Sequence, residues 1–374
     1  MPEPGPNKLR VLIAGGGTGG HLYPAIAIAD GLRKRQPGSD IRFIGSQWGI
    51  EATVLPRRNE IFYPLNITGL QRGFSGDAIK RNLNFSWRFL IAYRRCRQIL
   101  RSFKPQVVVG TGGYASGIPL LAAQRKKLAT VLQEQNSYPG FTTRRLAKKA
   151  SLVCLTYEEA APYLETDRWV LTGNPVRFAT DPPSQADSRR RLGLPLDQPV
   201  VFVLGGSQGS TPLNNHFMGN WRRYTEDMGL SLLWQTGRKD FERLQGEVDS
   251  GVPVVLLPFI EDMAAAYMAA DLVICRAGAM TLSELTALGR PAVLVPLPTA
   301  AADHQTLNAR ILRRKKAARL VPQVKLAAGV LEETVRDLFS DPNKLVEMAK
   351  RSLAQARPEA SETISNHILE LAGR

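Results

Sequence analysis

The sequence predicts an α/β protein with two Rossmann-like domains, each built on a parallel sheet, that face each other across a cleft. Two glycine-rich loops, at 15–20 and 205–210, each follow a strand-like apolar run and lie about 190 residues apart. Strand-like and helical stretches alternate along the chain, which is typical of parallel α/β sheets. Between the halves, Gly and Pro residues at 173–199 interrupt the pattern and indicate an irregular linker. The length of 374 residues also exceeds that of a typical single core.

In the first half, short apolar runs predict strands at 10–14, 41–45, 106–110, 129–133, 151–155 and 169–171. Helices are expected between them at 22–35, 80–103, 117–126 and 140–149. The first helix has an apolar stripe that includes Ala25, Ile28 and Leu32. We expect this domain to span residues 1–173.

In the second half, the same reasoning predicts strands at 200–204, 231–235, 253–257, 271–275, 291–295 and 318–321. Helices are expected at 212–227, 261–269, 279–288, 303–314 and 327–339. Ser210 or Thr211 suits the N-cap of the helix that follows the glycine loop. The domain is expected to span 174–342, and a last helical segment is expected at 343–371, within a terminal piece 343–374.

The positive charge is concentrated in one half of the chain. The net charge is +16, and residues 1–175 hold 25 Lys and Arg against 11 acids, whereas residues 176–374 hold 24 against 22. Residues 78–133 contain 11 basic residues and no acid. A surface of this kind attracts a polyanion, either nucleic acid or an anionic bilayer.

Within this basic half, the segment 72–104 mixes aromatic and aliphatic residues with Arg and Lys. That composition is typical of a helix that lies on an anionic membrane surface. The alternative is that Phe89, Ile91 and Leu100 simply face the core. Because the sequence contains no nucleic-acid module signature, we expect a membrane partner and no nucleic acid.

Several classes of site are not indicated. The three cysteines, Cys96, Cys154 and Cys275, have no metal-like spacing, and the last two lie in apolar runs as expected of buried thiols in a reducing compartment. No Asp-x-Asp pair and no cluster of His, Cys and acids is present, so we expect no metal and no cofactor. No secretory signal and no spanning segment is found, which predicts a cytosolic chain.

The first glycine loop formally satisfies the dinucleotide fingerprint Gly15-x-Gly17-x-x-Gly20. That fingerprint requires an acid at the end of the second strand, which here ends in Gly45-Ser46, so a nicotinamide or flavin enzyme is disfavoured. His21 follows the loop at the start of a helix, where the helix dipole favours a neutral ring that can act as a base. The alternative is an ordinary helix-capping histidine.

The second half contains groups suited to a sugar nucleotide. The loop 205–210 and the helix after it would stabilise a diphosphate leaving group. Glu284 could accept hydrogen bonds from the two ribose hydroxyls, or it could be an ordinary solvated residue. Gln305 and Asn308 are three residues apart on one helix, which suits them to bind sugar hydroxyls. Without a metal, positive charge at the diphosphate would come from helix ends and from Arg177.

Seven motifs in this order resemble the MurG family of glycosyltransferases, which add N-acetylglucosamine to the lipid-linked muramyl-pentapeptide of peptidoglycan synthesis. These motifs lie at 16–21, 110–117, 134–140, 173–177, 205–209, 276–284 and 303–309. The resemblance implies a GT-B fold, with the UDP-sugar mostly on the C-terminal domain and the last helix returning to the N-terminal domain. It also implies that 72–104 docks on the cytoplasmic face of the bacterial plasma membrane. Departures from the family pattern occur at Thr143 and at 299–302.

The resemblance implies a metal-independent, inverting transfer from UDP-N-acetylglucosamine to the muramyl C4 hydroxyl of lipid I, with His21 as the base. It implies donor contacts at Thr18, Gly19, Gly20, Asn136, Arg177, Ser207, Ile260, Ala279, Met280, Thr281, Leu282, Ser283, Glu284 and Gln305. We expect Gly112, Gly113 and Tyr114, in a third glycine loop, to face the acceptor. The alternative activity is that of another GT-B lipid glycosyltransferase, such as a diacylglycerol glycosyltransferase.

Overall fold

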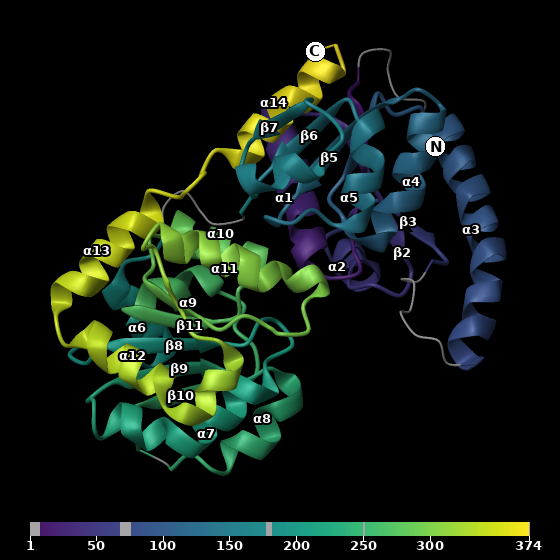
Figure 1. Cartoon of the computed structure of the whole chain (residues 1–374). Coiled ribbons are helices and arrows are strands. Elements are labelled where there is room, and N and C mark those ends of the chain that lie inside the picture. The colour runs from purple at the N-terminus through teal and green to yellow at the C-terminus, as the bar shows by residue number, and fades with distance from the viewer. Residues whose placement is uncertain (1–7, 68–75, 177–181, 250, 374) are drawn as a thin grey trace. The chain divides into compact units, whose positions relative to one another are not determined.

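The computed structural model describes residues 8–67, 76–176, 182–249 and 251–373 (Figure 1). The chain divides into two compact units. Unit 1 comprises Met1–Arg177 together with Pro358–Arg374, and unit 2 comprises Phe178–Arg357.

The strands of unit 1 form one parallel sheet. They are β1 (Arg10–Ala14), β2 (Asp40–Ser46), β3 (Phe62–Leu65), β4 (Val107–Gly110), β5 (Ala129–Glu134), β6 (Leu152–Leu155) and β7 (Trp169–Leu171). Their order in the sheet is β3-β2-β1-β4-β5-β6-β7. The chain therefore builds outward in one direction from β1 and in the other from β4, so that a topological switch point lies between these two strands.

Helices cover both faces of this sheet. They are α1 (Gly19–Arg35), α2 (Glu51–Arg57), α3 (Gly76–Phe103), α4 (Gly113–Arg125), α5 (Phe141–Leu146) and α14 (Ala360–Leu371). Apolar residues of α1, α2 and α14 form the core on one face, and those of α3, α4 and α5 pack on the other. Because both faces are covered, the central strands are apolar throughout, as Val11-Leu12-Ile13-Ala14 illustrates.

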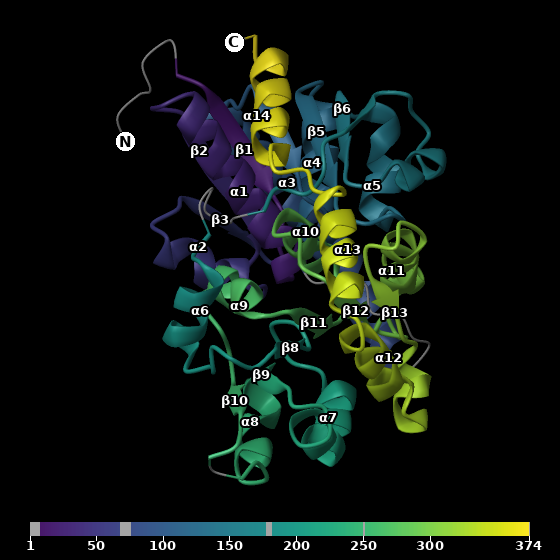
Figure 2. The same ribbon diagram turned by 90° about the vertical axis from the view of Figure 1, so that its left-hand side faces the viewer.

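The last helix, α14, packs along α1 although the two are more than 300 residues apart (Figure 2). The hydroxyl of Ser361 donates to the carbonyl oxygen of Ala27 over 2.7 Å. At Gly31 a β-carbon would lie 2.4 Å from the Ser361 hydroxyl oxygen, so this close approach requires glycine. Ile364 and Ile368 are fully buried in the core shared with β1 and α1.

Unit 2 repeats the architecture with a second parallel sheet. Its strands are β8 (Val200–Leu204), β9 (Ser231–Gln235), β10 (Val254–Leu257), β11 (Leu272–Cys275), β12 (Ala292–Leu294) and β13 (Arg319–Leu320). Their order is β10-β9-β8-β11-β12-β13, which places the switch point between β8 and β11. One face is covered mainly by α9 (Met263–Ala269), α10 (Ala279–Ala287) and α11 (His304–Arg314). The other face is covered by α7 (Thr211–Thr225), α8 (Arg238–Gln245), α12 (Val330–Phe339) and Met348 of α13 (Pro342–Leu353).

Two expectations about the connecting segments were wrong. The expected helical segment 343–371 is two helices, because the chain leaves the helical conformation around Pro358 between α13 and α14. α13 contacts α10 and α12 of unit 2, whereas α14 belongs to unit 1. The linker expected to be irregular at 173–199 contains α6 (Gln185–Leu192), which Ser184 caps by accepting from the Asp187 amide and which ends at Gly193 with φ 68°. The short elements β3, α2 and α8 were not predicted.

Candidate active site

The predicted glycine loops lie at the switch points of the two sheets. In unit 1, the loops after β1 and β4 both leave the carboxyl ends of neighbouring strands. In unit 2, the loop 205–210 after β8 and the turn 276–278 after β11 have the same relation. Ligands of open α/β sheets bind at such points, because adjacent loops diverge there and leave a crevice. In each unit the sequence motifs thus lie where open α/β sheets bind their ligands.

His21 is held in unit 1 by the loop after β4. Its Nδ1 lies 3.0 Å from the carbonyl oxygen of Thr111 and 3.1 Å from Oε1 of Gln135. Since the amide nitrogen of Gln135 donates to that same Thr111 carbonyl over 2.7 Å, its oxygen faces the imidazole. Both partners of Nδ1 are acceptors, so Nδ1 carries the proton and the neutral ring has its lone pair on Nε2. That tautomer is the one that a base acting through Nε2 requires.

The loop after β4 fits closely around the imidazole. Gly112 has φ 90°, and a β-carbon there would lie 2.9 Å from His21 Nδ1. A β-carbon on Gly113, with φ 73°, would lie 2.8 Å from the Gly16 carbonyl oxygen. The ring of Tyr114 covers Gly17 in the same way. The structure therefore brings the predicted acceptor-side residues together with His21 and the first glycine loop, where Thr18 and Gly20 are exposed.

The first glycine loop is already occupied by a side chain of the protein. Glu51, fully buried at the start of α2, accepts hydrogen bonds from the amides of Gly17 (2.7 Å) and Ser46 (2.9 Å). A β-carbon on Gly16 or Gly49 would lie within 2.2 Å of its carboxylate, so the surrounding glycines make room for it. The Gly17 amide is therefore bonded within the protein, whereas Thr18 and Gly20 at the start of α1 are exposed.

A second buried carboxylate organises the loop after β5. Glu134 accepts from the amide of Asn136 (3.1 Å), from its side-chain nitrogen (3.3 Å) and from the amide of Gly140 (3.0 Å). The turn 136–140 is thereby fixed, and Asn136, a predicted donor contact, is held half-buried.

In unit 2, the loop 205–210 is supported by the end of β9. Ser210 is the N-cap of α7 and accepts from the Leu213 amide, so the helix begins at Thr211. The buried side chain of Gln235 donates to the Gly206 carbonyl (3.1 Å) and accepts from the Ile260 amide (2.8 Å). It therefore joins two predicted donor contacts, the loop of Ser207 and the backbone of Ile260. Ser207 itself is exposed at the tip of the loop.

Arg276 lies buried behind this loop. Its guanidinium donates to the Ser210 hydroxyl (2.7 Å), to the carbonyls of Val295 and Pro296 (3.1 Å each) and to Gln323 (2.6 Å). Burial lowers its pKa to about 10, a value at which the group still carries its charge at neutral pH. Arg276 thus fixes the loops after β8 and β12 and places a positive charge beneath the start of α7.

Glu284 lies on α10 and is held by a residue that the sequence did not indicate. Oε2 of Glu284 accepts from the hydroxyl of the fully buried Tyr267 over 2.9 Å. Burial, together with the nearby Glu284 carboxylate, raises the pKa of Tyr267. Among the other residues expected at the donor, Ala279 and Leu282 are buried and Ser283 donates to the Ala279 carbonyl, whereas Met280 and Thr281 are half-buried. At the start of α10, polar side chains and backbone are therefore available to a ligand, whereas the side chain of Leu282 is buried in the core.

Gln305 joins α11 to the loop after β12, because its Oε1 accepts from the Leu297 amide over 3.0 Å. Just before it, Ala302 and Asp303 are consecutive left-handed residues, with φ 52° and 53°. Non-glycine residues in this region cost about 1–3 kcal/mol each and concentrate at ligand sites. Arg177, the remaining predicted donor contact, lies outside the described residues.

α3 has two different faces along its described part. Cys96, Ile99 and Leu100 are buried against the sheet. Trp87, Leu90 and Ile91 are 63%, 37% and 47% exposed, which corrects the alternative that Ile91 faces the core. They lie at helical positions i, i+3 and i+4 and therefore form one stripe, next to the exposed Arg88, Arg94 and Arg95.

The cysteines are buried and reduced. Cys96, Cys154 and Cys275 are free thiols, which confirms the prediction of burial for the last two. Burial raises the pKa of Cys96 and of Cys154 to about 12, so neither is a nucleophile at neutral pH. In the part of the chain that the structure describes, no group of three metal-binding side chains is found. Within the same ranges, no helix combines the length and apolarity needed to cross a bilayer.

Comparison with known proteins defines the class of the molecule. Models of the glycosyltransferase family 28 N-terminal and C-terminal domains match residues 11–154 and 200–364. The crystal structure of Acinetobacter baumannii MurG covers 97% of this chain and 99% of its own with a TM-score of 0.76 at 29% identity. A UDP-GlcNAc 2-epimerase from Neisseria meningitidis shares the fold alone, with a TM-score of 0.62 at 16% identity over 97% and 100% of the two chains. The protein is a glycosyltransferase with two parallel-sheet domains, as the sequence predicted.

The curated relatives are more specific. A protein of Chlorobium phaeobacteroides is 42% identical over 366 residues, covering 97% of this chain and all of the relative. One of Acetivibrio thermocellus is 38% identical over 370 residues, covering 97% and 98%. Both are named UDP-N-acetylglucosamine–N-acetylmuramyl-(pentapeptide) pyrophosphoryl-undecaprenol N-acetylglucosamine transferase. The chain belongs to this family of hexosyltransferases, which confirms the resemblance seen in its motifs.

Proposed function

We propose that the protein transfers N-acetylglucosamine from UDP-N-acetylglucosamine to the muramyl C4 hydroxyl of undecaprenyl-diphosphate-N-acetylmuramyl-pentapeptide. The reaction inverts the anomeric carbon and needs no metal ion. The similarity over nearly the whole chain to transferases named for this donor and acceptor carries the proposal.

In this proposal unit 1 supplies the base and the acceptor contacts. Nε2 of His21 takes the proton of the C4 hydroxyl as its oxygen bonds to the anomeric carbon, and the bond from that carbon to the UDP oxygen breaks. UDP leaves with the electron pair. The orientation of His21, with Nδ1 bonded to Thr111 and Gln135, supports this role. Gly112, Gly113 and Tyr114 would contact the acceptor.

Unit 2 is proposed to hold most of the donor. The amides of the loop 205–209 and the start of α7 would stabilise the diphosphate as its charge grows, with Arg276 adding positive charge from behind. Glu284, oriented by Tyr267, would accept hydrogen bonds from the ribose hydroxyls. The other proposed donor contacts are those that the family resemblance implies, at Thr18–Gly20, Asn136, Arg177, Ser207, Ile260, Ala279–Ser283 and Gln305.

Two replacements of His21 test the base. In His21→Asn the side-chain amide can keep the hydrogen bonds that Nδ1 makes with Thr111 and Gln135. In His21→Gln the longer side chain places its amide near the position of Nε2. Neither amide can act as a base. We expect kcat to fall by about 10²–10⁴ in both, while the Kd for UDP measured by calorimetry changes less than about threefold because the base does not bind UDP. If His21→Asn kept kcat within about threefold of wild type, the proton would have to go elsewhere.

A direct comparison of acceptors tests the substrate. Purified protein with UDP-N-acetylglucosamine is assayed with lipid I and, in parallel, with diacylglycerol. Product formed only with lipid I is expected. Product formed only with diacylglycerol would establish the alternative, a diacylglycerol glycosyltransferase.

We propose further that the protein acts as a peripheral enzyme on the cytoplasmic face of the bacterial plasma membrane, where its lipid-linked acceptor is found. The segment 72–104 would dock on anionic lipid, with the exposed stripe of Trp87, Leu90 and Ile91 entering the interface. Arg88 and Arg95 next to the stripe would lie at the level of the lipid headgroups.

Vesicle sedimentation tests the docking. A basic residue near an anionic surface contributes about 1 kcal/mol, so Arg88→Gln with Arg95→Gln should lower partition about 30-fold. Trp87→Ser should weaken partition in neutral vesicles as well. The matched control is Ile61→Ser, which removes another exposed apolar side chain outside α3 and should leave partition unchanged. Equal partition of all variants would refute docking through α3.

A further inference from the structure

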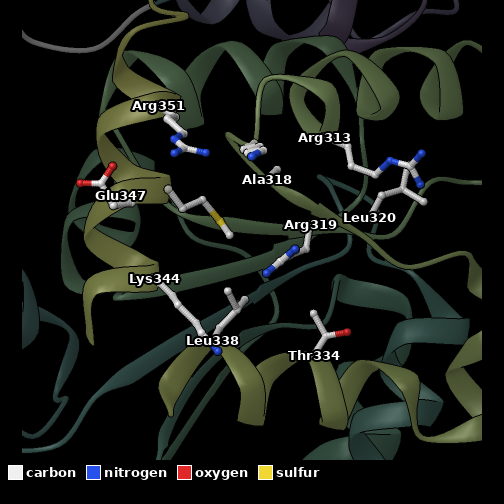
Figure 3. Close-up of a pocket in the computed structure, with 11 residues that line it drawn as sticks. Arg313, Ala318, Arg319, Leu320, Thr334, Leu338, Lys344, Glu347 and Arg351 are labelled. Atoms are coloured by element: carbon white, nitrogen blue, oxygen red, sulfur yellow. The ribbon is translucent and has the colours of Figure 1, made fainter. Parts of the chain in front are cut away.

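Unit 2 contains a cavity that the transfer reaction does not use. Its volume is about 490 Å³, within the range of ordinary small-molecule sites. It lies between α13, the edge strand β13 and the ends of α11 and α12 (Figure 3). None of its lining residues belongs to the loops after β8, β11 or β12 that form the proposed donor site.

The rim of the cavity is strongly basic. Five cations line it, Arg313, Lys316, Arg319, Lys344 and Arg351, against the single carboxylate of Glu347. Figure 3 shows Arg351 reaching from α13 toward the strand and Arg319 reaching back from β13 toward the helix.

The neighbouring carboxylates neutralise only part of this charge. Asp337 pairs with Lys344 at 2.5 Å and with Arg319 at 3.5 Å, and Glu347 pairs with Lys350 at 3.1 Å. Among the described residues, no ion pair is found for Arg313, Lys316 or Arg351. Arg313, Lys316 and Arg351 therefore line the cavity without a compensating carboxylate. Uncompensated cations that line a cavity attract an anion.

The floor of the cavity is apolar. Ala318, Leu338 and Met348 are buried and line it from the strand and both helices. An apolar floor with a cationic rim fits a ligand that has an anionic head and an apolar body. Arg319 and Arg351, which reach toward each other from the strand and the helix, carry the planar guanidinium that matches the paired oxygens of a phosphate group.

We propose that this cavity binds small organic phosphates. The phosphate group lies among Lys316, Arg319 and Arg351, and the apolar part of the ligand lies on Leu338 and Met348. A ligand bound in this way contacts both α13 and the edge strand β13.

Titration calorimetry with phenyl phosphate tests the site on the full chain. Removing two guanidinium contacts, in Arg319→Gln with Arg351→Gln, should weaken binding about 100-fold. The control Arg336→Gln removes an exposed arginine of α12 that does not line the cavity and should bind like wild type. Inorganic phosphate, which lacks the apolar part, should bind more weakly than phenyl phosphate. Equal affinity of wild type and the double variant would overturn the proposal.

A second arm distinguishes a soluble ligand from a lipid headgroup. Partition onto phosphatidylcholine vesicles that contain phosphatidic acid is measured for wild type, the double variant and the Arg336→Gln control. Loss of phenyl phosphate binding with unchanged vesicle partition identifies a soluble phosphate as the ligand. Loss of both identifies a lipid phosphate that reaches the same cavity. Retention of both in the double variant contradicts the site.

Discussion

The buried carboxylate of Glu51 gives the sharpest test of how the first glycine loop is built. In Glu51→Gln the side chain keeps its shape, but its amide nitrogen must face one of the two backbone donors, Gly17 or Ser46. One hydrogen bond to a charged group is then lost where water cannot replace it, at a cost of about 1.5–3 kcal/mol. For a domain of about 150–250 residues, each 1 kcal/mol lowers Tm by about 2–4 °C, so we expect a drop of about 3–12 °C.

Differential scanning calorimetry measures this change. The exposed Glu165→Gln, in the same unit, is the control and should shift Tm by less than about 1 °C. In Glu51→Ala the two amides lose their anion, and added acetate should recover part of the lost Tm by occupying the vacated place. If Glu51→Gln had the same Tm as wild type, the charge of the carboxylate would not be needed to hold the loop.

Two further outcomes are expected. Tyr267→Phe removes the hydroxyl that orients Glu284. KM for UDP-N-acetylglucosamine should therefore rise about fivefold with little change in kcat. An unchanged KM would show that Glu284 does not bind the donor. Burial lowers the pKa of His216 below its usual 6.5, so the unfolded state binds more protons than the native state below about pH 6.5. The free energy of unfolding should therefore decrease as the pH is lowered through this range, by at most about 1.4 kcal/mol per pH unit. Urea titrations across this range should show a flatter profile for His216→Gln; parallel profiles would argue against the shift.

Features set by neighbouring residues were predictable from the sequence. An apolar run followed by glycines correctly predicted β1 and β8 with their loops. Ser210 correctly predicted the start of α7. The start signals of α6, Ser184 and Asp187, are also local, but the two prolines before them suggested an irregular segment. The strand β3 contains Pro64, which a sheet tolerates because β3 lies at its edge.

The groups that position the site could not be predicted, because each acts on a distant residue. Gln135 contacts His21 across 114 positions, and Glu51 contacts Gly17 across 34. Tyr267 and Glu284 are 17 apart on different helices. No periodicity or motif in a single sequence pairs such residues, since their contact depends on which strands become neighbours in the sheet.

The packing of α14 on α1 has a consequence for the order in which the protein is made. A chain leaves the ribosome from its N-terminus, and domains generally fold as they emerge. Unit 2 is continuous and can be completed once Arg357 has emerged. Unit 1 emerges first, but the part of α1 that packs on α14 stays uncovered until Ile364 and Ile368 arrive. The domain that begins the chain is therefore the last to finish folding, and a stalled or shortened product exposes the core of unit 1 while leaving unit 2 intact.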